Sequence, residues 1–427
     1  MVQILSSFSA APSALSAEAA SRRNNLAITL AAFLASVGFM VVMPSLPGLI
    51  REVAGADLGR SGLWLGLAIG VSPLLTAITG PMWAIVGARY GHKPMIERSL
   101  VFIGIGIGLM ALASSPLQVV GLRAVIGGLG GVSITALAAL TASTPRRELG
   151  RAVGALQAAQ TAGSMVGPLI GGALGVLLGM RQSFVVSGAI FGMALLLVHW
   201  LYREEAARPA DSSPRPARGA APSGGGSGAG MAVALLAAFV VQFVEGGFIV
   251  LLPLQVERLG ATGDSLPWVI GAGLSATYLA ASIAAAVGGR LVGRRSATSL
   301  LGWVLLLGLL ALPPLALAAT WWQFVALRVL LALLVGAGPT FAYSLAATLA
   351  PPERRGAMVS LISSAGIFGW AASPLAAGAL IQVSPSLLLG LDAGLYALLG
   401  VTLWAAERGL VDRLPGALQG LVRLPNR

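Results

Sequence analysis

The stretch GSMVGPLIGGAL at residues 163–174 recurs as GWAASPLAAGAL at residues 369–380, with six identical positions and a constant shift of 206 residues. GFMVVMP at 38–44 returns as GFIVLLP at 247–253, a shift of 209, and Arg123 matches Arg328, a shift of 205. An internal repeat of this length predicts two homologous halves.

The composition places these halves in a membrane. Of 427 residues, 56% are hydrophobic and 10% charged, whereas soluble domains carry about 25% charged residues. A membrane span needs about 20 mainly apolar residues. Twelve such stretches lie at 26–49, 62–86, 96–113, 117–140, 152–178, 182–201, 231–256, 266–289, 297–318, 322–349, 356–382 and 386–405. We therefore predict an all-α integral membrane protein, with twelve transmembrane helices in two pseudo-symmetric six-helix bundles of the same orientation.

The stretches also predict the domain organisation. The segment between the two sets is rich in Pro, Ser and Gly, which is typical of a flexible linker. We expect a disordered cytoplasmic tail (1–25), an N-terminal bundle (26–201), a cytoplasmic linker (202–230), a C-terminal bundle (231–405) and a cytoplasmic amphipathic tail (406–427).

The positive charges predict the topology. With the N-terminus inside and twelve crossings, 21 of the 27 Lys and Arg fall in inside segments, four in outside segments and two within spans. This bias predicts cytoplasmic termini. The net charge of +12 is then a topology signal that meets anionic lipid, and we expect no nucleic-acid partner.

Most enzyme classes are excluded. The chain has no Cys and two His, which argues against disulfides, thiol catalysis and most metal sites. No HExxH, GxSxG or Walker pattern occurs, so we expect no enzyme, cofactor or catalytic residue, and energy comes from a gradient. The expected partners of a monomer are a small-molecule substrate, protons and membrane lipids.

Ionisable residues within spans are by default functional candidates, and four of them are strong candidates: Arg123, Glu245, Arg328 and Asp392. A carboxyl in apolar surroundings binds or releases a proton as an arginine leaves or approaches. Our hypothesis is that Glu245 exchanges a proton while Arg123 or Arg328 supplies the competing charge. The alternatives are a static Glu245–Arg328 pair and, for Asp392, a structural polar contact.

A glycine ridge marks the fifth stretch. Gly163, Gly167, Gly171 and Gly175 recur every four residues, so another helix can approach closely. Tight packing alone explains such a ridge. The alternative is a mechanical role, in which the ridge and Pro168 allow the two halves to slide.

Several motifs resemble the major facilitator superfamily. PMWAIVGARYGHKP at 81–94 resembles its cytoplasmic loop signature, but Ala84 and Ala88 stand where the family has Gly and Asp. In the family, that Asp is implied to latch the cytoplasmic gate with basic residues and a helix N-terminus. The Arg-x-x-x-Gly pattern of 123–127 is similar to a family element that is associated with proton coupling. Residues 163–172 are similar to an element that is associated with exporters. MPSLP at 43–47 is similar to an element of twelve-span drug/proton antiporters. The implied gating residues are Arg89, Gly91, Lys93, Gly163, Gly167, Pro168, Gly171 and Gly172.

The resemblance implies the major facilitator fold, in which spans 1, 4, 7 and 10 line a central cavity. This ranks Glu245 above Asp392 as the coupling carboxyl. Apolar, soft or polar side chains suit amphiphilic substrates, although each is also compatible with plain packing. The candidate substrate-binding residues are Met40, Met43, Gln242, Glu245, Tyr278, Phe341 and Tyr343.

We therefore predict a multi-pass transporter of a bacterial inner membrane that exports small, drug-like amphiphiles by proton antiport and alternating access, in the manner of multidrug resistance proteins. The alternatives are a dedicated exporter of a siderophore or other metabolite, and uptake by symport or uniport. An alternative from a different functional class is a membrane receptor or scaffold that transports nothing.

Overall fold

The structure is a computed structural model that describes residues 14–55, 58–145, 147–203, 228–292, 294–349 and 355–407. These residues form fifteen α-helices and the short 3₁₀ helix η2 (Gly263–Ser265). The α-helices are α1 (Ala14–Val41), α2 (Leu46–Ala54), α3 (Leu58–Tyr90), α4 (His92–Met110), α5 (Pro116–Leu129), α6 (Val132–Ser143), α7 (Leu149–Leu177), α8 (Met180–Leu201), α9 (Gly228–Arg258), α10 (Leu266–Leu291), α11 (Ala297–Ala316), α12 (Trp321–Val335), α13 (Gly338–Leu349), α14 (Arg355–Leu380) and α15 (Pro385–Glu407).

The all-α membrane fold is confirmed, and the helices match the twelve predicted spans. Ten of the spans formed by the described residues are long and apolar enough to cross a membrane by length and composition. The other two are α4, which carries Lys93, Glu97 and Arg98 in its first turns, and α7, which is rich in glycine. Both are long helices, of 19 and 29 residues.

Three predicted spans are each broken into two helices. The first ends at Val41 and resumes as α2, because Pro44 and Pro47 lack the amide hydrogen that a continuous helix needs. The fourth breaks between α5 and α6 at Gly131, whose φ of 93° is a left-handed conformation that favours glycine. The tenth breaks at Gly336–Ala337, between α12 and α13.

Part of the predicted disordered tail is helical, so that prediction is wrong for residues 14–25. α1 begins at Ala14, and Asn24 is buried. The Asn24 side chain donates to Arg203 O (2.8 Å) and accepts from Arg203 N (3.1 Å). This exchange fixes the end of α8 against α1. Likewise α9 begins at Gly228, inside the predicted linker. Residues 1–13, 204–227 and 408–427, which include most of the predicted tails and linker, lie outside the described residues.

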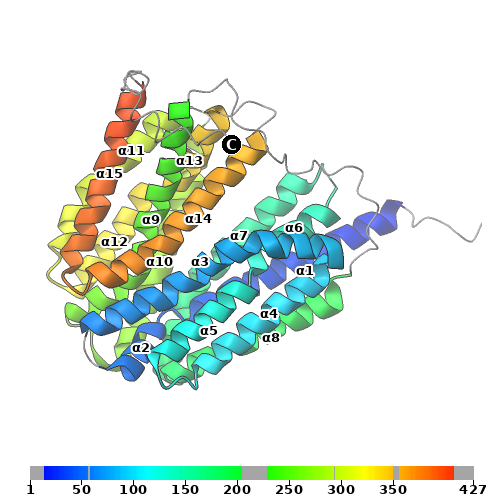
Figure 1. Cartoon of the computed structure of the whole chain (residues 1–427), viewed down its shortest axis with the longest axis horizontal. Helices are drawn as coiled ribbons and strands as arrows, with labels where there is room; N and C mark the ends of the chain where they lie inside the picture. The colour runs from blue at the N-terminus through cyan, green and yellow to red at the C-terminus, as the bar shows by residue number, and fades with distance from the viewer. Residues whose placement is uncertain are drawn as a thin grey trace, which may run out of the picture.

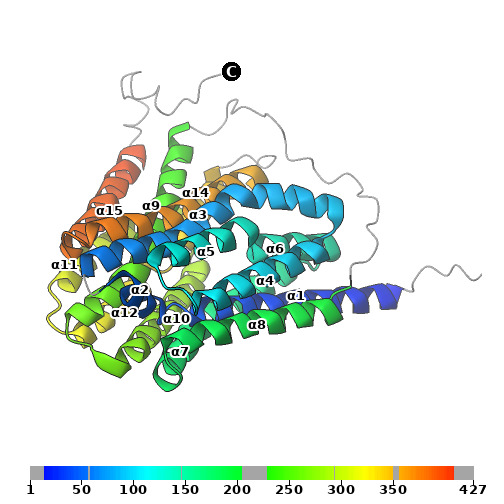
Figure 2. The same ribbon diagram turned by 60° about the horizontal axis from the view of Figure 1, so that its bottom comes forward.

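The helices form two groups, the N-terminal half (α1–α8) and the C-terminal half (α9–α15), which Figure 1 shows converging where α2 lies. We call the end with the α3–α4, α6–α7 and α10–α11 connections the basic end, since Arg89, Lys93, Arg147 and Arg290 lie there. The opposite end, with α2, is the far end. Across the boundary, α3 packs on α14 and α7 on α10, and Figure 2 shows α3 beside α14.

Two glycine crossings join the halves. At the α3–α14 crossing, a Cβ on Gly66 would collide with Pro374 O, and would lie 2.8 Å from Gly378 Cα. At the α7–α10 crossing, a Cβ on Gly271 would collide with Pro168 O. These two crossings occupy equivalent places in the repeat, and both lie toward the far end of their helices. The halves are therefore in backbone contact at the far end.

An ion pair strengthens this closure. The guanidinium of Arg51, on α2, pairs with the carboxylate of Glu257 near the end of α9. The two helices belong to different halves, so this pair links the halves at the far end. On the same side, Arg181 pairs with Glu52 at 2.9 Å within the N-terminal half.

Three of the four glycines in the α7 ridge face their own half. A Cβ on Gly167 would lie 2.6 Å from Met40 Cβ and 2.8 Å from Val37 O, and Gly163 and Gly171 also meet the backbone of α1. By contrast, Cβ atoms on Gly172 and on Gly175, the fourth glycine of the ridge, would each lie 2.8 Å from an atom of Pro267 of α10, in the other half. The ridge therefore packs α7 mainly against α1, and its last glycine lies at the boundary between the halves.

This packing predicts the effect of a side chain at Gly167. Gly167→Leu inserts four carbons where α1 backbone and Met40 already lie, and overpacking of this kind costs about 1–3 kcal/mol. We expect a lower melting temperature for the purified protein, measured by thermal unfolding in detergent. Gly192→Leu on α8 is the matched control, because no atom lies within 4 Å of its Cβ position. Equal melting temperatures for the two variants would contradict the packing assignment.

Candidate functional site

The C-terminal half contains a buried ion pair. Arg328 Nη2 of α12 donates to Glu245 Oε2 of α9 at 2.6 Å. The Arg328 side chain is 2% exposed and that of Glu245 is 21% exposed. The Arg328 guanidinium also lies 4.0 Å from the ring centre of Phe248. Arg328 is thus enclosed by protein, and the Glu245 side chain is only partly exposed, because its Oε1 is buried and makes no hydrogen bond to the described residues.

Arg123, the repeat-related arginine, has no comparable partner. It is fully buried in α5, and its Nη2 contacts Met43 Sδ at 3.9 Å. Its guanidinium lies 5.0 Å from the ring centre of Phe39. Within the described part of the chain, its Nε and Nη1 make no hydrogen bond.

The repeat explains the difference between the two arginines. The shift of 209 that relates 38–44 to 247–253 pairs Phe39 with Phe248, so each arginine faces an equivalent aromatic ring. The same shift pairs Ser36 with Glu245. The two halves therefore share the arginine and the ring, but a serine replaces the carboxylate in the N-terminal half.

Gly127, four residues after Arg123, has a packing role. A Cβ there would collide with the backbone of Ser72 on α3, and Thr76 Oγ1 donates to Gly127 O at 3.0 Å. The Arg-x-x-x-Gly pattern thus sets the distance between α5 and α3.

Two more polar residues accompany the ion pair. Asp392 of α15 is 1% exposed and close enough to Glu245 and Arg328 to interact electrostatically with both. Tyr278 of α10 interacts with the same two charges. The four groups come from α9, α10, α12 and α15, so the sequence-predicted Glu245, Arg328 and Asp392 are brought together, whereas Arg123 lies apart.

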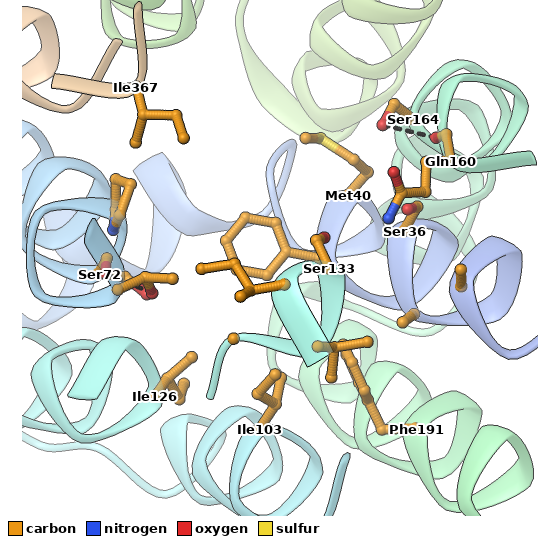
Figure 3. Close-up of a pocket in the computed structure, with 18 residues that line it drawn as sticks. Ser36, Met40, Ser72, Ile103, Ile126, Ser133, Gln160, Ser164, Phe191 and Ile367 are labelled. Atoms are coloured by element: carbon orange, nitrogen blue, oxygen red, sulfur yellow. Dashed lines mark hydrogen bonds between the residues drawn. The ribbon is translucent and has the colours of Figure 1, made fainter. Parts of the chain in front are cut away.

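A cavity of about 390 Å³ lies near the middle of the helices, lined mainly by the N-terminal half (Figure 3). Apolar side chains and hydroxyl or amide groups share its wall, and none of the residues that line it is charged. The lining includes Ser36, Phe39 and Met40 of α1, Ser72 and Thr76 of α3, Ile126 of α5, Ser133 of α6, Gln160 and Ser164 of α7, and Ile367 of α14.

The other predicted substrate residues lie elsewhere. Met43 is buried beside Arg123, and the Phe341 ring packs at Gly288, 3.1 Å from its Cβ position. Gln242 and Tyr343 both approach Gly366 of α14. Of the candidates, only Met40 lines the described cavity. The hydroxyls of Ser36, Ser72 and Thr76 were not predicted, because serine and threonine in a helix often bond to their own backbone.

The predicted gating loop joins α3 to α4 through a single residue, Gly91, whose φ is 99°. Lys93 Nζ donates to His199 O of α8 at 2.8 Å, and His199 Nδ1 lies 3.1 Å from Glu97 Oε1. Arg89 stacks over Tyr90 at 5.5 Å. These contacts connect the loop to its own half, and the residue-88 side chain lies outside the described part.

The unequal pairing of the two arginines predicts unequal effects on stability. Glu245→Gln removes the carboxylate that is bonded to the buried Arg328, and the loss of one partner of a buried ion pair is destabilising. Arg123→Gln removes a charge that has no carboxylate partner, so we expect an unchanged or higher melting temperature. Thermal unfolding of both variants in detergent checks this. Adding Arg328→Gln to Glu245→Gln should restore stability, and a loss in Arg123→Gln equal to that in Glu245→Gln would contradict the assignment.

Comparison with known proteins supports the fold and the internal repeat. A profile of the Major Facilitator Superfamily matches residues 28–233 and again 234–419. The chain is 27% identical over 316 residues to "Multidrug resistance protein MdtG" of Salmonella choleraesuis (strain SC-B67), covering 74% of this chain and 78% of that protein.

Solved structures show the same fold. A bacterial homologue of the human lysosomal transporter Spinster, in an inward-facing and unoccupied conformation, superposes with a TM-score of 0.70 at 19% identity, covering 90% of this chain and 98% of that one. The nucleoside transporter NupG gives a TM-score of 0.68 at 11% identity, covering 89% and 98%. With two matched copies of the family profile and an all-helical twelve-span fold, this chain belongs to the Major Facilitator Superfamily and is a membrane transporter, not an enzyme.

Proposed function

We propose that this transporter exports small amphiphilic compounds from the cytoplasm in exchange for protons. The observation that carries the proposal is the Glu245–Arg328 pair, in which a buried arginine is bonded to one carboxylate oxygen of a glutamate whose side chain is 21% exposed. A proton on Glu245 removes the negative charge that balances Arg328. Proton binding therefore changes the relative stability of the paired conformation, as a proton-driven transporter requires.

The cavity supports the substrate class. Its mixed wall of apolar side chains and hydroxyls, without a charged group, suits an amphiphile that carries an apolar ring and a few hydrogen-bonding groups. The relative named for multidrug resistance supports the same class.

The direction rests on charge and on the closed far end. Arg89, Lys93, Arg147 and Arg290 lie at the basic end, and 21 of the 27 Lys and Arg fall in the segments that the sequence predicts to be inside. We therefore place the basic end in the cytoplasm. The glycine crossings and the Arg51–Glu257 pair close the far end. In this conformation the cavity then faces the cytoplasm, from which an exporter loads its substrate.

The proposal predicts proton release triggered by substrate. Energised everted vesicles with the full chain receive, one at a time, an uncharged aromatic drug, a cationic dye, a catecholate siderophore and a disaccharide, and a pH-sensitive dye follows the lumen. We expect the drug and the dye to release protons from the lumen, and Glu245→Gln to abolish the release. Glu148→Gln is the matched control, because Glu148 is exposed at the start of α7.

Each other outcome decides against part of the proposal. A response to the siderophore or the disaccharide alone establishes a dedicated exporter. Accumulation of the same probes in right-side-out vesicles establishes uptake. An unchanged response in Glu245→Gln removes Glu245 from coupling.

A further inference from the structure

Asp392 is a buried carboxyl without a bonding partner. Its residue is 1% exposed, and neither carboxyl oxygen receives a hydrogen bond from the described residues. Asp392 forms no ion pair with any of the described residues, because the nearby Arg328 is bonded to Glu245. An isolated ionised carboxylate in an apolar interior is so unfavourable that the group takes up a proton instead. A buried carboxyl whose two oxygens lack hydrogen bonds favours the neutral, protonated form.

Its helix aims it at the ion pair. Leu388, Asp392 and Tyr396 are spaced by four residues and form one buried face of α15. At one end of this face, Leu388 Cδ2 lies 3.5 Å from the Cβ position of Gly247, two residues after Glu245. At the other end, the Tyr396 ring fills the notch left by Gly308 of α11.

Asp392 thus faces the junction of α9, α11 and α12. Val335 of α12, two turns after Arg328, reaches the same notch at Gly308 as Tyr396 does. The titratable groups that face Asp392 are Glu245, Arg328 and, on its own helix, Tyr396. The described α11 has no ionisable residue, and α14 has only Arg355, at its basic-end start.

The charges of this cluster do not balance without a proton. Glu245 and Asp392 carry two potential negative charges, and Arg328 supplies one positive charge. Because all three share one buried region, a neutral cluster requires one proton on the two carboxyls. Because Arg328 is bonded to Glu245 and not to Asp392, we assign that proton to Asp392. Exchanging the roles of the two carboxyls gives a second neutral arrangement.

We propose that Asp392 is a second proton-carrying carboxyl, and that Arg328 changes partner between Glu245 and Asp392 during the transport cycle. This inference rests on the proposed proton antiport. It adds to it a site on α15, a helix that the resemblance to the family places away from the central cavity.

The cycle balances in protons and charge. With Arg328 paired to ionised Asp392, Glu245 holds the shared proton. A proton from outside then binds Asp392 and frees Arg328; Glu245 releases its proton to the cytoplasm and pairs with Arg328, which is the observed arrangement. Transfer of the remaining proton from Asp392 to Glu245, as Arg328 returns to Asp392 during the outward movement of substrate, completes the cycle with one proton moved inward for each substrate exported.

Infrared spectroscopy of the purified full chain, reconstituted in carboxyl-free lipid at neutral pH, tests this without a substrate. A protonated carboxyl has a C=O stretching band separate from that of a carboxylate. We expect the wild type to show this band and Asp392→Asn to lack it. Glu245→Gln should also lack it, although the substitution leaves Asp392 in place, because Arg328 then pairs with Asp392 and ionises it. Tyr396→Phe is the matched control and should keep the band.

A band that persists in Glu245→Gln would overturn the proposal, since Asp392 would then be a static, neutral group. A wild type that lacks the band would also overturn it. Proton release from everted vesicles provides a second test should Glu245→Gln fail to fold. Asp392→Asn should lose substrate-triggered release while keeping the Glu245–Arg328 pair, and normal release in Asp392→Asn would again overturn the proposal.

The two tests separate this inference from the proposed function. Substrate-triggered release that requires Glu245 but not Asp392 leaves the antiport standing and removes the partner exchange. The expected infrared pattern in a protein that releases no protons with any probe supports the partner exchange and removes the antiport.

Discussion

The close approach of helix backbones at glycines is the constraint on which this structure depends. Each of α7 and α14 contacts a helix of its own half and one of the other half. In a membrane, apolar side chains gain little by leaving lipid, so helices associate where small residues permit close van der Waals contact. The pattern Gly163, Pro168 and Gly172 of α7 is repeated as Gly369, Pro374 and Gly378 of α14. Each copy provides close backbone contacts, at crossings that the repeat relates to each other.

The helices are duplicated between the halves, but the ionisable side chains around the two buried arginines are not. Both halves hold a buried arginine beside an aromatic ring, at Arg123 and Arg328. Among the described residues, carboxylates lie next to the arginine of the C-terminal half, whereas the N-terminal half has Ser36, which lines the cavity, at the place of Glu245. The wall of the cavity is therefore uncharged, and the buried ion pair lies in the other half.

Much of the fold could be predicted from the sequence because it depends on local properties. The lengths of the apolar stretches and the repeat predicted the twelve spans. A carboxyl in the middle of a span identified Glu245 as a candidate, with Arg328 as one of its two predicted partners. The direction of side chains was harder to predict. Gly171 and Gly172 are adjacent in sequence, yet one meets α1 and the other α10, because successive residues of a helix point about 100° apart. Met43 and Phe341 have suitable chemistry for a cavity but face packed neighbours. For Asp392, the position of its span in the family fold did not predict that the side chain is buried within the C-terminal half.

The separation of cavity and ion pair constrains how transport is coupled. None of the residues that line the described cavity belongs to the Glu245–Arg328 pair, so a substrate seated there does not displace a proton by contact. The two sites are connected through the frame, since α1 packs on α7, α7 on α10, and α10 carries Tyr278 beside the pair. Under the proposed function, substrate and proton each bias one equilibrium between conformations. Thermodynamic linkage then makes the effect reciprocal: the factor by which a bound proton weakens substrate binding equals the factor by which substrate weakens proton binding.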